Sequence, residues 1–176
     1  VGAVTLVDAS TGAAFTGGSY TVSTTNSLHG STASDAVGDQ GVYALTNGNY
    51  VVASEFWDGV ATDTGAATWG NGTTGIVGAV TSSNSIVGST SGDRIARHIT
   101  VLTNGNFSIR SEFWKGVVTD GGAVTWGDGT TGHTLNGIFE AVSATNSLVG
   151  TTASDHAGLH GIQALTNGNY VVASAT

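Results

Sequence analysis

Two glutamate–tryptophan pairs come closest to a binding site in the residue types and spacing of this sequence. Glu55 and Trp57 recur 57 residues later as Glu112 and Trp114, and each pair follows an apolar stretch. If that stretch is a strand, alternation places the glutamate and tryptophan of a pair on one face. An exposed indole can stack on a sugar ring while the neighbouring carboxylate accepts sugar hydroxyls. The alternative is a tryptophan that packs on the adjacent repeat.

Three aspartates that recur in register form a second candidate site. Asp35, Asp93 and Asp155 each follow an Asn-Ser motif and a run rich in Gly, Ser and Thr. Carboxylates in such loops can bind Ca²⁺, although the dense Asp-x-Asp-x-Asp spacing of strong calcium loops is absent. The competing interpretation is that each aspartate caps a turn by accepting backbone N–H groups. No other cofactor is expected.

Catalysis is not expected from the sequence. Cysteine is absent, which excludes a disulfide framework and a thiolate metal site. The serines, histidines and acids show no nucleophile motif in a recognisable order. We therefore expect a protein that is not an enzyme.

A repeated hairpin positions these residues. The motif Leu-Thr-Asn-Gly-Asn lies within 44–52, 101–109 and 164–172, flanked by apolar residues. Asn-Gly between apolar runs predicts a β-hairpin, because both residues tolerate positive φ angles. A period near 57 residues indicates a propeller, a solenoid or a similar array. We treat 1–176 as one repeat domain with repeats of about 1–65, 66–121 and 122–176.

Each repeat is predicted to contain four strands, beginning with 2–6, 66–69 and 123–126 and ending with the hairpin. Both faces of the hairpin are apolar near the turn, so the sheet is expected to lie between two other layers. The predicted fold is all-β, with each repeat a four-stranded antiparallel unit like a propeller blade. A closed threefold β-prism or trefoil and a β-solenoid remain alternatives.

The register of the hairpin follows from its turn. A two-residue turn at Asn47-Gly48 pairs Leu45 with Tyr50. If the last strand continues past this pair into Phe56 and Trp57, alternation buries the phenylalanine and leaves Glu55 on the other face. The same prediction holds for Phe113 and Glu112.

Composition excludes two classes of partner. Only 9% of the residues are charged, against about 25% in an average domain, and the formal net charge is −8. Nucleic-acid binding is not expected, because phosphate recognition requires clustered cations. The sequence contains no 18-residue apolar run, so no membrane span is predicted. All four cations lie in the middle repeat: Arg94, Arg97, Arg110 and Lys115. This clustering indicates either a contact site or sequence drift between the repeats.

Three motifs together carry a family resemblance. Residues 122–132 (Gly-Ala-Val-Thr-Trp-Gly-Asp-Gly-Thr-Thr-Gly), the Asn-Ser-Leu-Val-Gly motif at 146–150 and residues 165–174 resemble a tandem repeat of large secreted bacterial exoproteins of the filamentous-haemagglutinin and adhesin type. The resemblance implies a secreted or bacterial-surface location, an adhesive or scaffolding role and no catalytic residues. The first repeat departs from the pattern at 6–10, and the third lacks the Phe-Trp segment. These departures indicate terminal capping or a cut through a longer array.

The expected function is therefore that of a non-enzymatic extracellular structural or adhesive repeat. It would associate with copies of itself or with neighbouring repeats, because the strands at 3–6 and 170–174 are both available as edges. The alternative, from a different class, is a lectin-like module that binds glycans through Trp57, Trp114 and their glutamates.

Overall fold

Strands and turns make up the computed structural model, which describes residues 1–174 and contains no helix within them. The strands, in chain order, are β1 (Ala3–Val4), β2 (Leu28–His29), β3 (Gly41–Ala44), β4 (Tyr50–Ser54), β5 (Ala66–Gly70), β6 (Gly78–Ala79), β7 (Ser85–Val87), β8 (His98–Val101), β9 (Phe107–Ser111), β10 (Ala123–Gly127), β11 (Ser147–Val149), β12 (Gly161–Ala164) and β13 (Tyr170–Ala173).

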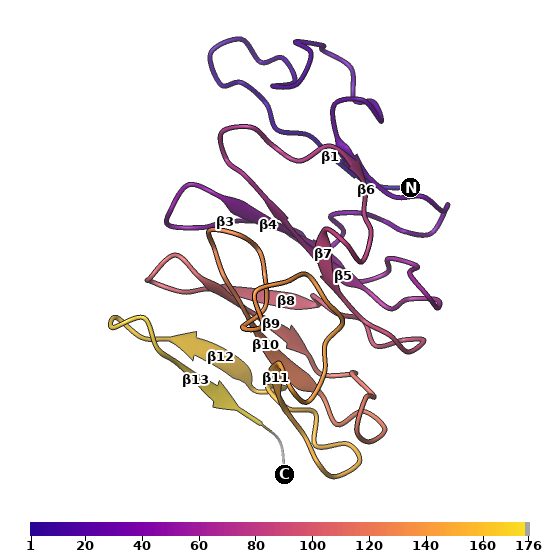
Figure 1. Cartoon of the computed structure of the whole chain (residues 1–176), viewed down its shortest axis with the longest axis vertical. Coiled ribbons are helices and arrows are strands. Elements are labelled where there is room, and N and C mark those ends of the chain that lie inside the picture. Colours follow the sequence, from indigo (N-terminus) through magenta and orange to yellow (C-terminus); the bar gives the residue numbers. More distant parts are fainter. Residues whose placement is uncertain (175–176) are drawn as a thin grey trace.

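Two complete sheets form the middle of the molecule. Sheet one has the order β3-β4-β5-β7 and sheet two the order β8-β9-β10-β11, and neighbouring strands in both are antiparallel. A small sheet of β1, β2 and β6 lies at the N-terminal end, and the hairpin β12-β13 lies at the C-terminal end. Figure 1 shows these four layers stacked along the longest axis, with β1 and β13 in the outermost layers.

The two end layers are complementary halves of the repeated sheet. Three hydroxyl pairs join equivalent strands at 2.6–2.7 Å: Thr5 with Ser27, Thr68 with Ser85, and Thr125 with Ser147. Strands β1 and β2 therefore correspond to the last two strands of sheet one, whereas β12 and β13 correspond to its first two. The described chain thus contains two whole sheets between the second half of one sheet and the first half of another.

The inner strand β4 of sheet one is buried on both faces, as the sequence predicts, whereas Val42 of β3 is 51% exposed. All five residues of β4 are buried. Val51 and Ala53 pack toward sheet two with Ile99 and Ile109, while Tyr50 and Val52 lie in a separate cluster with Leu28 of the N-terminal layer. Burying one such aliphatic side chain stabilises the fold by about 1.5–3 kcal/mol, so these contacts between layers contribute substantially to stability.

The all-β repeat architecture is confirmed, and the finer alternatives can be judged from the stack. The ends of the described stack do not meet in Figure 1, so the closed threefold prism or trefoil is wrong for this chain. Antiparallel meanders stacked face to face are also not the coils of a β-solenoid. The units resemble propeller blades in strand order, but residues 1–174 form an open stack and no closed ring.

The predicted hairpin register is wrong by one residue. Tyr43 pairs with Val51 and Ala44 with Tyr50, and the Leu45 amide donates to the Asn49 carbonyl at 2.8 Å. The loop therefore has three residues, of which Gly48 alone has a positive φ, of 89°. A one-residue slip exchanges the faces of one strand relative to the other. The positive φ predicted for this glycine and its equivalents Gly105 and Gly168 is confirmed.

The predicted burial of the phenylalanines is also wrong. Strand β4 ends at Ser54, and a turn follows in which the Trp57 amide donates to the Ser54 carbonyl. Glu55 is 3% exposed, whereas Phe56 is only partly buried. Glu112 and Phe113 repeat this arrangement. The alternation rule fails here because the chain is no longer a strand.

Gly48 lies in the hairpin loop and Gly72 lies in the loop after β5, and different contacts constrain the two residues. This difference gives a first prediction. A Cβ on Gly48 meets no atom within 4 Å, whereas a Cβ on Gly72 lies 1.7 Å from the Gly48 carbonyl oxygen. We expect Gly48→Ala to cost about 1 kcal/mol through backbone strain alone. Gly72→Ala should cost clearly more, because the backbones must separate. Urea denaturation of both variants measures the difference, and equal costs would contradict the close approach.

Candidate functional site

Glu55 and Glu112 meet three arginines between the two complete sheets. Arg97 bridges the two acids, with its Nη1 3.7 Å from Glu55 Oε1 and its Nε 3.3 Å from Glu112 Oε1. Arg94 lies 3.5 Å from Glu55, and Arg110 lies 3.4 Å from Glu112. We call these five residues the glutamate–arginine network. It links successive repeats, because each acid comes from a different sheet.

Burial sets the energetics of this network. The side chains of both glutamates are 4% exposed, whereas the Arg94 and Arg97 side chains are 37% and 33% exposed. Burial raises the pKa of Glu55, and the nearby charges of Arg97 and Arg94 only partly oppose that rise. Gln40 also donates to Glu55 at 2.8 Å. Removing an arginine leaves a buried carboxylate with one charged partner in place of two, which is costly.

The network explains three of the four cations that the sequence gathers in the middle repeat. Arg94 stacks on Phe56 and Phe113, with its guanidinium carbon 5.2 Å and 5.9 Å from the ring centroids. Its pairing with Glu55 was not predicted. The available signal was the coincidence of three arginines in the one repeat that follows Glu55 and contains Glu112.

The tryptophans predicted to bind sugar are buried. Trp57 is 6% exposed and Trp114 is 2% exposed, and each belongs to a hydrophobic cluster between layers. The prediction of a half-exposed indole beside a carboxylate is therefore wrong, and the stacking platform of the lectin-like hypothesis is missing at both positions. The alternative, a tryptophan that packs on the adjacent repeat, describes the geometry.

The three repeated aspartates cap loops. Asp93 Oδ2 accepts the amides of Ser89 and Thr90 at 3.0 and 2.8 Å, and its Oδ1 accepts the Lys115 amide at 3.1 Å. Asp35 makes the same contacts in the preceding repeat, and Asp155 accepts the amides of Thr151 and Thr152. The carboxylates are thus committed to backbone donors. Among residues 1–174, no group of three or more His, Asp or Glu side chains is placed to hold a metal ion.

Hydrogen bonds shift the pKa of the first cap. Burial alone would raise the pKa of Asp35, but donors from Thr32, Asp58 and Ser31 outweigh it, so the pKa lies below its usual value. The ionised form is therefore the one that the folded loop requires.

The structure also bears on the membrane. In the part of the chain that the structure describes, there is no helix of the length and hydropathy needed to cross a bilayer.

Comparison with known proteins gives one match. A family model described as a repeat of unknown function (DUF5650) matches residues 1–39, 44–97, 101–159 and 164–176. The later three segments each begin at a Leu-Thr-Asn-Gly-Asn hairpin. A search of curated proteins and a search of solved structures found no match. The family match does not connect the chain to exoproteins of the filamentous-haemagglutinin type.

The bridging arginine gives the second prediction. Arg97→Ala leaves two buried carboxylates with fewer partners, and because the guanidinium is one-third exposed we expect a loss of about 2 kcal/mol. Lys115→Ala is the control, since this lysine donates to the Ser91 carbonyl and pairs with neither glutamate. Its cost should stay within about 0.5 kcal/mol. Equal losses for the two variants in urea denaturation would show that the bridge does not link the layers.

The aspartate cap gives the third prediction. Asp35→Asn should cost about 2 kcal/mol at pH 7, because an amide cannot replace the charged acceptor. The folded-state pKa lies below the usual 3.8, so the contribution of Asp35 is present above that value and is lost as pH falls through the folded-state pKa. The stability difference between wild type and variant should therefore shrink below pH 3.8. Asp155→Asn, at a partly exposed cap, is the control and should cost less.

Proposed function

The chain belongs to the family of repeats of unknown function DUF5650, and from that premise we propose that it is a non-enzymatic structural module. In this proposal, the module extends an array of stacked sheets by binding a further repeat, or a second copy, through an exposed end face. We define the end face as the outward side of the hairpin β12-β13 together with β11. Its apolar residues are Leu148, Leu165 and Val171.

The proposal rests on exposed apolar residues whose equivalents in sheet one are buried in the core. Val171 is 54% exposed, whereas Val51, its equivalent in sheet one, is fully buried. Leu148 is 59% exposed, whereas its equivalent Ile86 is fully buried. In sheet one these positions are covered by sheet two. The same cover over the end face would stabilise an assembly by about 1.5–3 kcal/mol for each large side chain.

An open strand edge supports the same conclusion. Strand β4 pairs with β5 and β9 pairs with β10, but the equivalent edge of β13 pairs with no strand of residues 1–174. Exposed edges of this kind bind another strand readily. A secreted or bacterial-surface location and an adhesive role belong to this proposal through the resemblance in sequence alone.

Self-association tests the proposal and gives the fourth prediction. We expect light scattering to show masses that rise with concentration above the 17.4 kDa of the single chain. Val171→Asp should weaken this association, because it places a charge on the end face. Val60→Asp is the matched control, since Val60 is 82% exposed and lies outside the end face. A strict monomer at every concentration would contradict association between copies.

A further inference from the structure

We infer that one part of the end face, the groove beside Leu148 and the open edge of β13, is a docking site for a further DUF5650 repeat, namely for its Phe-Trp segment and the strand equivalent to β10. This inference rests on the proposed function and specifies its partner. The equivalent N-terminal segment of a second copy, residues 3–9, is not the partner at this groove. Three features of the described residues support this assignment.

The first feature is a groove where the repeats elsewhere place a tryptophan. Trp57 shares a buried cluster with Leu28 and Val37. Trp114 shares another with their equivalents, Ile86 and Ile95.

At the next equivalent position, Leu148 and Ala157 line an open groove of about 250 Å³. Its lining includes Ser174, the last residue that the structure describes. In both earlier repeats, therefore, a tryptophan covers the surface that is equivalent to this groove.

The second feature is the close fit between each hairpin and the strand beside it. A Cβ on Gly70 would lie 2.2 Å from the Tyr50 ring, and a Cβ on Gly127 would lie 2.2 Å from the Phe107 ring. A Cβ on Gly129 would lie 1.7 Å from the Gly105 carbonyl oxygen, as found for Gly72. The strand must therefore carry glycine at both positions, in the pattern Trp-Gly-x-Gly.

The C-terminal hairpin carries the residues that impose this requirement for glycine on a neighbouring strand. Tyr170 is the equivalent of Tyr50, and Gly168 has the same φ of 89° as Gly48. Asn169 is the equivalent of Asn49 and Asn106, whose side-chain oxygens accept the amides of the second glycine at 3.1 and 3.0 Å. A docked Gly-x-Gly segment would therefore also gain this hydrogen bond.

The third feature excludes the first strand of a second copy. Val7 stands where Gly70 and Gly127 stand, and Ala9 stands where Gly72 and Gly129 stand. Both side chains would collide with a hairpin docked as in the other repeats.

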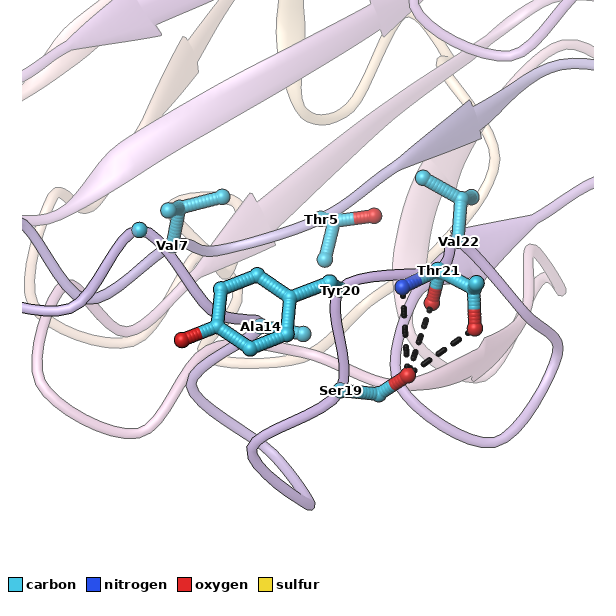
Figure 2. Close-up of a pocket in the computed structure, with 8 residues that line it drawn as sticks. Thr5, Val7, Ala14, Ser19, Tyr20, Thr21 and Val22 are labelled. Atoms are coloured by element: carbon cyan, nitrogen blue, oxygen red, sulfur yellow. Dashed lines mark hydrogen bonds between the residues drawn. The ribbon is translucent and has the colours of Figure 1, made fainter.

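The loop that follows leaves this segment exposed, since Tyr20 is 79% and Val7 is 51% exposed. Figure 2 shows the Tyr20 ring lying over Ala14 beside Thr5 and Val7, around a small pocket of about 80 Å³. Hairpin docking at the N-terminal layer is therefore opposed by the side chains of Val7 and Ala9 alone.

Peptide binding to the full chain tests the inference. The probe is a fluorescent peptide with the sequence of residues 113–132, which holds the Phe-Trp segment, the third strand and the Gly-x-Gly loop. We expect saturable binding by fluorescence anisotropy. A control peptide with the substitutions Gly127→Val and Gly129→Ala, which copy the N-terminal layer, should bind at least tenfold more weakly. A peptide of residues 1–11 should not bind.

A variant of the chain locates the site. Leu148→Asp changes an exposed residue in the groove, so the fold should persist by circular dichroism while peptide binding falls at least tenfold. Absence of binding by the 113–132 peptide, or equal binding by the control peptide, would overturn the inference. So would equal binding by residues 1–11.

The outcomes separate this inference from the proposed function. Self-association of the chain without peptide binding would mean that the end face uses another geometry, which overturns only the inference. Peptide binding with the glycine requirement, in a chain that stays monomeric, would retain the inference and remove association between copies.

Discussion

Two-sided burial is the constraint on which this structure depends. A sheet with apolar side chains on both faces must be covered twice, and here each cover is another sheet of the same kind. Stacking satisfies every interior layer but leaves the last layer with one uncovered face. The exposure of Val171, set against the full burial of Val51, is the direct consequence of this constraint. The need to cover apolar side chains, which holds the interior layers together, therefore also predicts the end face as the binding surface.

Polar contacts between layers fix the position of one apolar sheet on the next. The Gly129 carbonyl accepts hydrogen bonds from Asn47, Asn49 and the Trp69 indole at 2.8–2.9 Å, which ties one hairpin turn to the Gly-x-Gly loop of the next sheet. The glutamate–arginine network joins the same two sheets at another place. A displaced buried carboxylate loses its charged partners, so these contacts oppose any other stacking position. We interpret these contacts as devices that fix the stacking position more than as sources of stability.

Sequence patterns predicted local structure, such as turns, better than they predicted which segments pair with or contact one another. The three hairpins and the positive φ of Gly48 follow from the Asn-Gly motif, because a turn depends on neighbouring residues. The loop length did not follow, since Asn-Gly occurs in both two- and three-residue loops, and the one-residue error exchanged faces. The strand end at Ser54 reversed the expected exposure of Glu55 and Phe56. The pairing of Glu55 with Arg97 joins residues of different repeats, which no periodic pattern within one repeat specifies.

The divergence of the first repeat gives the stack a direction. A repeat protein needs end units that differ from its interior, because an interior unit at an end exposes core. At the N-terminal end, Val7 and Ala9 replace the two glycines on which hairpin docking depends. At the other end, the hairpin retains every residue needed to bind a further strand. In the docking mode that we infer, Val7 and Ala9 would collide with a docked hairpin, whereas the C-terminal hairpin would accept a strand that has glycine at both positions. The two missing side chains of that strand are then the feature by which the hairpin recognises its partner.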